Sequence, residues 1–150
     1  MIPLLNWIAL RRLIRTIGQP VYMIRALLWG RLFGEGGKFC SGYLHRMYRP
    51  DNDRTLHNHP WRWAFSIILA GGYTEERLLK DGKVIARRMR PGMFNILGPG
   101  SFHRIIELHG KETWTLFIAG PRISDWGFID PESSLFIPHK AYFELKGIKE

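Results

Sequence analysis

The chain has 150 residues, of which 45% are hydrophobic and 23% are charged. These proportions are typical of a globular domain and exclude a chain that is disordered along most of its length. The 22 Lys and Arg residues outnumber 13 Asp and Glu residues, and the formal charge of +9 favours anionic partners without identifying one. The single cysteine, Cys40, excludes an intramolecular disulfide and is typical of a reducing compartment, so we expect a cytoplasmic protein.

Residues 1–36 are predicted to form two short amphipathic helices. Apolar residues recur there at helical spacing, and arginines fall off the apolar stripe. Pro20 separates the two helices, because proline lacks an amide hydrogen and clashes with the preceding turn. Two roles stay open for this segment. It can pack against the domain or a second subunit, or it can offer a basic surface to nucleic acid or to an anionic membrane.

Residues 37–150 are predicted to form one antiparallel β-domain with an irregular C-terminal tail. Segments rich in Tyr, Phe, Ile, Val and Trp alternate with turn signals such as Asp81–Gly82 and Pro91–Gly92. About six to eight short strands at this spacing favour a sandwich or barrel over parallel α/β units. In the tail, residues 139–147 are compatible with a closing helix.

His57 and His59 are the first candidate metal ligands. Residues i and i+2 of a strand point to the same side, so both rings can converge on one point. Imidazole is a common ligand of zinc, iron, nickel and copper. His103 follows two Gly/Pro turns and enters a later strand, from which its ring can reach the same centre. Taken alone, His57 and His59 could also be two exposed histidines or two histidines hydrogen-bonded to the backbone. We expect His45, on a neighbouring strand, to be a hydrogen-bonded residue of that kind.

The spacing of these residues resembles the two motifs of the cupin superfamily. The first, G-x5-H-x-H-x3-4-E-x6-G, is matched at His57, His59 and Gly71. The second, G-x5-P-x-G-x2-H-x3-N, is matched at Gly92, Gly100 and His103. The resemblance implies a single antiparallel jelly-roll β-barrel, here preceded by the N-terminal α-helices, with a metal ion in its mouth. Over a longer run the chain is similar to a little-characterised group of small bacterial and phage cupins without a settled activity.

The chain departs from both motifs. Ala64 stands in place of the motif glutamate, and Asp51, Gly98 and Glu107 replace the first glycine, the proline and the closing asparagine. Three neutral ligands would leave a divalent ion with its full charge, and an anionic substrate could supply the missing negative ligand. Alternatively, Ala64 indicates a barrel that has lost its metal ion and binds its ligand by shape.

Cupins with three histidines include the thiol dioxygenases, so the resemblance implies a mononuclear Fe(II) oxygenase that acts on a small anionic substrate, with Mn, Ni and Zn as alternative metals. We predict Tyr73 and Arg122 as catalytic groups near the mouth, because an arginine fork binds carboxylate or phosphate. Other polar groups expected there are Ser66, Glu75 and Arg104.

Whether the protein is an enzyme stays open. A metal-cupin isomerase or epimerase for a sugar-like anion is one alternative, and a non-catalytic module for nucleic acid or anionic membrane is the other. We also expect a homodimer, because such barrels have exposed sheet edges and the chain is rich in tryptophan.

Overall fold

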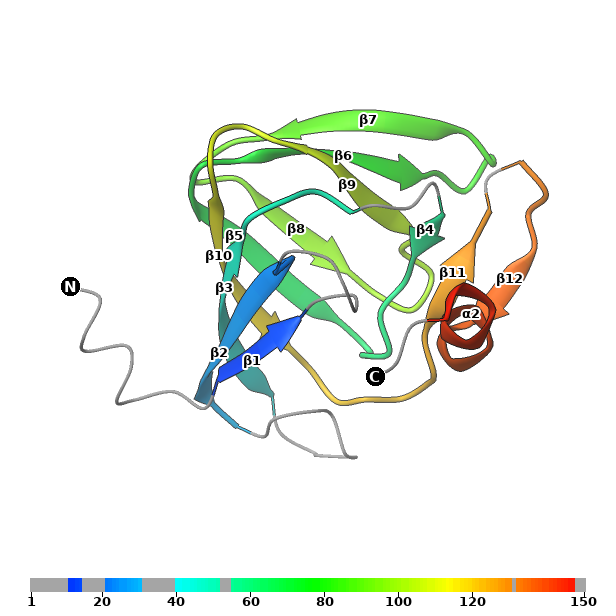
Figure 1. Cartoon of the computed structure of the whole chain (residues 1–150), viewed down its shortest axis with the longest axis horizontal. Coiled ribbons are helices and arrows are strands. Elements are labelled where there is room, and N and C mark those ends of the chain that lie inside the picture. Colours follow the sequence, from blue (N-terminus) through cyan, green and yellow to red (C-terminus); the bar gives the residue numbers. More distant parts are fainter. Residues whose placement is uncertain (1–10, 15–20, 31–39, 52–54, 131, 148–150) are drawn as a thin grey trace.

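Two facing antiparallel sheets make up most of the protein (Figure 1). The computed structural model describes residues 11–14, 21–30, 40–51, 55–130 and 132–147. The first sheet has the spatial order β1 (Arg11–Ile14), β2 (Met23–Trp29), β3 (Ser41–Met47), β10 (Thr113–Ala119), β5 (Ala64–Ala70) and β8 (Phe94–Leu97). The second has the order β12 (Phe136–Pro138), β11 (Gly127–Ile129), β4 (Leu56–His57), β9 (His103–Leu108), β6 (Tyr73–Leu78) and β7 (Val84–Met89). The prediction of a mainly β, antiparallel domain is therefore confirmed.

Polar side chains lie between two apolar clusters in the space that the sheets enclose. Along β3, Met47 belongs to one cluster and Tyr43 to the other, and the buried His45 stands between them. One cluster is formed by Met23, Met47, Ile68, Tyr73, Met89 and Ile105, and the other by Tyr43, Trp61, Ala64, Leu97, Phe117 and Ala119. The polar groups buried beside them are Ser66, Glu75, Asn95, His103 and Thr115. The domain is thus built around a polar middle that its apolar ends shield from water.

The N-terminal helices predicted for residues 1–36 are wrong wherever the structure describes that segment. Arg11–Ile14 form β1 and Met23–Trp29 form β2, and β2 pairs with β3 along most of its length. Apolar residues lie on both faces of β2, so their spacing fits a strand as well as a helix. Pairing with β3, the next strand along the chain, decided the outcome. The rest of the predicted helical segment lies outside the described residues.

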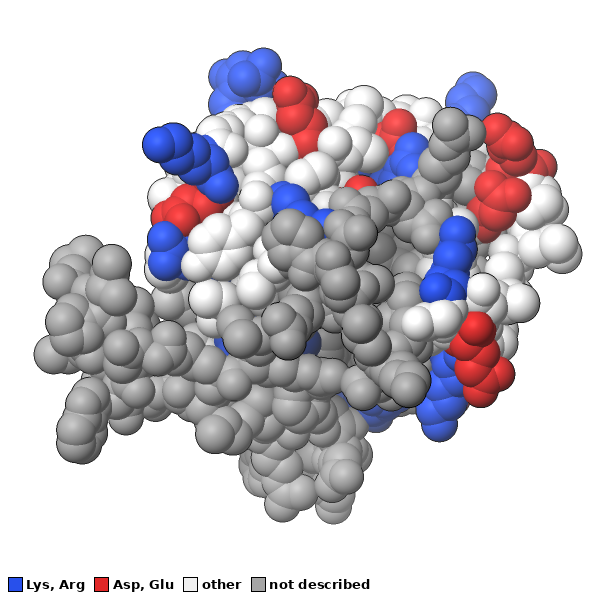
Figure 2. All heavy atoms as spheres, viewed as in Figure 1, with Lys and Arg blue, Asp and Glu red and all other residues white. Residues whose placement is uncertain are grey.

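In the described residues of this segment, the correction replaces with strands the basic amphipathic helices on which a nucleic-acid or membrane role rested. On the face drawn in Figure 2, the described Lys and Arg side chains lie apart from one another, and several lie beside Asp or Glu. Arg104 pairs with Glu76 and Lys83 with Asp81, for example. Among the described residues, no helix is long and apolar enough to cross a membrane.

The C-terminal helix is confirmed as α2 (His139–Lys146), which ends at Gly147 in a left-handed conformation. It contacts β11 and β12. Its Tyr142 ring stacks on Phe128 of β11, with ring centroids 3.9 Å apart. Because β11 pairs with β4, this packing supports the strand that carries His57.

Candidate metal centre

Strand β4 and the two residues that follow it carry His57 and His59. His57 ends β4 and pairs with His103 of β9, and His59 follows two residues later. Between them, Asn58 points the other way, as strand alternation requires. Its Nδ2 donates to the carbonyl oxygen of Pro99 at 2.7 Å, and its Oδ1 accepts from the backbone N–H of Gly127 at 2.8 Å. Asn58 thereby fixes the backbone from which both rings project.

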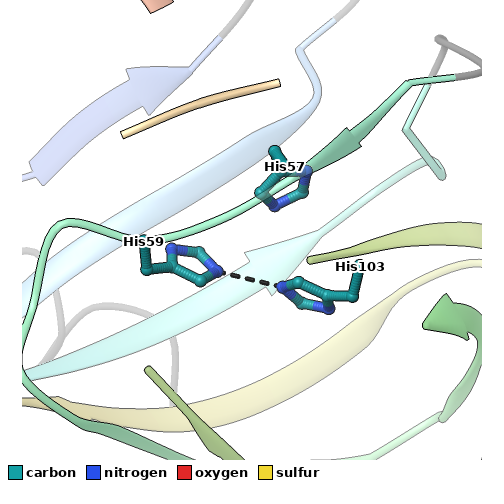
Figure 3. Close-up of side chains that lie close together, drawn as sticks. All are labelled: His57, His59 and His103. Carbon is teal, nitrogen blue, oxygen red and sulfur yellow. Dashed lines mark hydrogen bonds between the residues drawn. The ribbon is translucent and has the colours of Figure 1, made fainter. Parts of the chain in front are cut away.

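The rings of His57, His59 and His103 converge (Figure 3). One ring nitrogen from each lies within 4.8 Å of the other two. The centroid distances are 5.3 Å for His57–His59, 4.9 Å for His57–His103 and 5.2 Å for His59–His103. Sequence reasoning predicted this convergence from two separated segments, and the structure brings all three residues together.

The donor set fits a metal ion. The Nε2 atoms of His59 and His103 are 3.0 Å apart and share a proton in a hydrogen bond. Two nitrogens bound at about 2.1 Å and at right angles on one ion lie about 3.0 Å apart, so an ion can take the place of that proton with little movement of the rings. Three imidazoles suit iron, zinc, nickel or copper.

The electrostatics of the site keep the rings of His57 and His59 neutral, as metal ligation requires. The His57 side chain is 19% exposed, yet its pKa falls to about 4, chiefly because the ring loses contact with water; Asp51 and Glu75 oppose this change, and the His103 ring adds to it. Desolvation also holds the pKa of His59 well below its usual value, and the neighbouring rings and Arg25 add to this effect. At neutral pH no proton competes with an ion for these two rings.

Glu75 of β6 orients the third ring. Its side chain is fully buried, and Oε2 lies 3.0 Å from His103 Nδ1 and 2.9 Å from Asn95 Nδ2. Burial alone would raise the pKa of Glu75, but the hydrogen bond from His103 and the charges of Arg77 and Arg87 hold it below its usual value. The carboxylate is therefore ionised and accepts the Nδ1 proton of His103, which leaves Nε2 with its lone pair toward the other two rings.

Tyr73, predicted as catalytic, lies behind Glu75. Its hydroxyl oxygen accepts a hydrogen bond from Asn95 Nδ2 at 3.2 Å, and its side chain is buried. Burial, together with the charge of Glu75, raises the pKa of Tyr73, so the hydroxyl keeps its proton at neutral pH. Tyr73, Asn95 and Glu75 thus form one buried network that ends at His103.

Arg122, the other predicted catalytic group, lies after β10 in a backbone bridge with Trp61. Its Nη2 donates to Asp125 at 3.1 Å. The Trp61 ring stacks on His59 with centroids 5.5 Å apart, which connects the Arg122 segment to the centre. Arg104, by contrast, pairs with Glu76, which alternates with the inward-facing Glu75 along β6, so the structure does not bring it to the site.

Sequence reasoning missed three contributors to the site. Asn58 could have been found from strand alternation, since the middle residue of the His-x-His pair must face away from the metal and needs its own partners. Asn95 carries no such signal, because its role depends on pairing between β5 and β8. Arg25 was missed because a helix was expected where β2 forms; β2 pairs with β3, and Arg25 donates to His45, which was expected as a hydrogen-bonded strand residue.

Comparisons with known proteins agree with this fold. No protein-family model matches the chain, and no curated protein does. Among solved structures, a putative mannose-6-phosphate isomerase from Ralstonia eutropha JMP134 has a TM-score of 0.54 at 19% identity, over 70% of this chain and 89% of its own. FeII HppE in complex with substrate has a TM-score of 0.54 at 11% identity, over 74% and 56% of the two chains.

A variant of oxalate decarboxylase from Bacillus subtilis has a TM-score of 0.55 at 13% identity. That alignment covers 94% of this chain and 35% of the decarboxylase. The chain therefore spans about half of HppE and a third of the decarboxylase, and at these identities the likeness concerns the fold. These neighbours are cupin-type proteins, and the chain has a cupin-type fold whose three-histidine cluster fits a cupin metal site.

Proposed function

We propose that the protein is a metal-dependent enzyme in which His57, His59 and His103 hold Fe(II), and that it is an oxygenase acting on a small anionic substrate. The observation that carries the proposal is the convergence of three ring nitrogens within 4.8 Å. Burial keeps the His57 ring neutral, and Glu75 orients the His103 ring for ligation. Fe(II) in the FeII HppE structure, which shares the fold, supports the choice of iron.

The proposed roles of the other residues follow from their contacts. A bound iron ion would supply redox chemistry and Lewis acidity at positions that three protein ligands leave open. Glu75 keeps the His103 proton on Nδ1, and Asn95 and Tyr73 hold Glu75 in place. Trp61 covers one side of His59 and limits the access of water to that ring. Arg122 is proposed to act at the rim, beside Trp61.

Metal content and nitric oxide binding test the proposal together. The wild type, incubated without oxygen with Fe(II), should retain about one iron per chain and give the electron paramagnetic resonance signal of an iron–nitrosyl complex, because nitric oxide needs an open position. His57→Ala and His103→Ala should lose both. His109→Ala is the matched control, since His109 contacts Thr74 and not the cluster. Iron that is retained without a nitrosyl signal would contradict an open site.

The requirement for oxygen distinguishes the isomerase or epimerase alternative from the oxygenase. An isomerase working on a sugar-like anion turns over under anaerobic conditions, whereas an oxygenase consumes oxygen in proportion to product. The fold shared with a putative mannose-6-phosphate isomerase makes a panel of sugar phosphates the first set to assay anaerobically. Turnover there would replace the oxygenase assignment and leave the metal site in place.

A further inference from the structure

Asp51 is a second carboxylate beside the three-histidine cluster. Its side chain is partly buried, and its Oδ2 lies 4.0 Å from Nδ1 of His57. Glu75, the first carboxylate, lies 3.0 Å from Nδ1 of His103. Two of the three candidate ligands therefore have a carboxylate on the Nδ1 side of the ring, and the two carboxylates come from different segments of the chain.

Asp51 is fixed to the strand that carries His103. Its backbone N–H donates to the carbonyl oxygen of Ile105 at 2.8 Å, and its Oδ2 accepts from the backbone N–H of Ile105 at 2.7 Å. Ile105 lies two residues beyond His103 on β9, and His103 pairs with His57 of β4. The two bonds to Ile105 thus hold the carboxylate beside the pair of strands from which these two rings project.

The negative charge of Asp51 acts on the His57 ring. Loss of water is the main cause of the low pKa of His57, and Asp51 is the largest influence in the opposite direction, ahead of Glu75. Tyr22 responds to the same charge. Burial is the main cause of its raised pKa, and the charge of Asp51 and a hydrogen bond to that carboxylate raise it further.

The residue at position 51 distinguishes this chain from the cupin motif. Ala64 replaces the motif glutamate and so removes a carboxylate from the ligand set, whereas Asp51 stands where the motif has a glycine. Glycine has no side chain that could reach a ring. A carboxylate that does not bind an ion directly can still orient a ligand and place negative charge near the ion.

We propose that Asp51 is a positioning residue of the metal centre, which accepts a hydrogen bond from Nδ1 of His57 when Nε2 of that ring binds the ion. The inference rests on the proposed metal centre. The separation of 4.0 Å exceeds a hydrogen bond by about 1 Å, which a small rotation of the ring closes. A divalent ion on Nε2 draws electrons from the ring and makes Nδ1–H a stronger donor to a carboxylate. His57 and His103 are then held alike, each between the ion and a carboxylate.

Proton NMR of the cobalt(II)-loaded protein tests this bond without any catalytic assay. The ring N–H protons of cobalt-bound histidines resonate far outside the normal range, and a hydrogen bond to a carboxylate slows their exchange with water. At neutral pH the wild type should show slowly exchanging N–H signals from both His57 and His103. Glu75→Gln should broaden or remove the His103 signal, and Asp51→Asn should broaden or remove the His57 signal.

Metal affinity provides the second measurement. In competition with a chromophoric chelator, Asp51→Asn should bind cobalt about tenfold to a hundredfold more weakly than the wild type. The asparagine oxygen can still accept from the Ile105 amide, so a purely structural role of Asp51 predicts little change. Asp51→Glu keeps the charge and should lie between the wild type and Asp51→Asn.

Asp81→Asn is the matched control for charge. Asp81 pairs with Lys83 in the turn between β6 and β7, so its replacement removes the same charge away from the cluster. It should change neither the N–H signals nor the affinity. If Asp51→Asn does not fold, the wild-type His57 signal decides; it can be assigned through Phe128, whose ring centroid lies 6.2 Å from that of His57.

Three results would overturn the role of Asp51 while leaving the metal centre intact. They are a His57 N–H that exchanges rapidly in the wild type, equal affinities of Asp51→Asn and Asp81→Asn, and a loss of affinity in Asp51→Asn with the His57 signal unchanged. Failure of the wild type to take up cobalt is a different result, because it contradicts the proposed metal centre and removes this inference with it.

Discussion

Glu75 and His103 form a buried pair in which the carboxylate Oε2 lies 3.0 Å from the ring Nδ1. The pair fixes the tautomer of the ring and aims Nε2 at His59. Asn95 Nδ2 donates to the same oxygen at 2.9 Å, and Arg87 Nη1 forms an ion pair with the other oxygen, Oε1, at 3.4 Å. A histidine with its far nitrogen held in this way is a stronger and better oriented metal ligand than a freely rotating one.

Replacing Glu75 by glutamine should weaken metal binding by about tenfold to a hundredfold, because a neutral amide no longer favours the Nδ1 proton of His103. Competition with a chromophoric chelator measures the change. Glu76→Gln is the matched control, since Glu76 pairs with Arg104 and does not contact the cluster. Equal metal affinity in the two variants would show that Glu75 does not tune the site.

Asn58 should be required for the stability of the site segment. Asn58→Ala leaves the Pro99 carbonyl and the Gly127 amide without a side-chain partner, which should cost about 2 kcal/mol of unfolding free energy. Urea denaturation of the metal-free protein measures it. Ser101→Ala, which removes one bond to Gly98 in the adjoining turn, should cost less. A larger loss for the serine variant would mean that Asn58 does not hold this backbone.

The strand alternation of His57 and His59, and the glycine turns before His103, were enough to predict that the three rings converge and that a β-domain surrounds them. In both cases the signal is local, because each ligand's direction depends on its own strand. The registers that bring β4 next to β9 and β5 next to β8 are contacts between distant segments, so Asn95 could not be assigned a role from the sequence.

The error at the N-terminus has the same origin. In β2, Met23 and Ala26 are both buried although they lie on opposite faces of the strand, so apolar residues recur at intervals that fit either period. Only the pairing with β3 distinguishes a strand from a helix there. Because of this error, the contact between Arg25 and His45 could not be predicted from the sequence.

The metal-free protein should lose stability as the pH falls below about 6.5. Between that value and the folded pKa of His57, about 4, the unfolded chain binds a proton that the folded chain does not, so acid favours unfolding. His57 alone should contribute a loss of about 3 kcal/mol across this window, and His59 and His45 act in the same direction.

Urea denaturation at several pH values measures this slope, and His57→Gln should make it shallower. Saturating metal should move the loss to lower pH, because a bound ion competes with the proton. An unfolding free energy that stays level between pH 7 and about 4.5 would contradict buried, neutral histidines in the folded state.

The predicted homodimer has a candidate surface on the outer face of the first sheet. Its edge strand β8 exposes Phe94 by 54% and Ile96 by 64%, and Leu69 of the neighbouring β5 is 49% exposed. Exposed apolar edges favour association. We expect a dimer in sedimentation velocity, and a monomer for Ile96→Lys. Val84→Lys, on the other sheet, is the control, and a wild type that sediments as a monomer would end this prediction.

Anomalous X-ray scattering from crystals of the Fe(II)-loaded protein, collected at the iron edge, tests the central claim most directly. We predict one strong peak within bonding distance of a ring nitrogen from each of His57, His59 and His103. Absence of a peak among these rings, or an iron bound only at another histidine such as His109, would contradict the account.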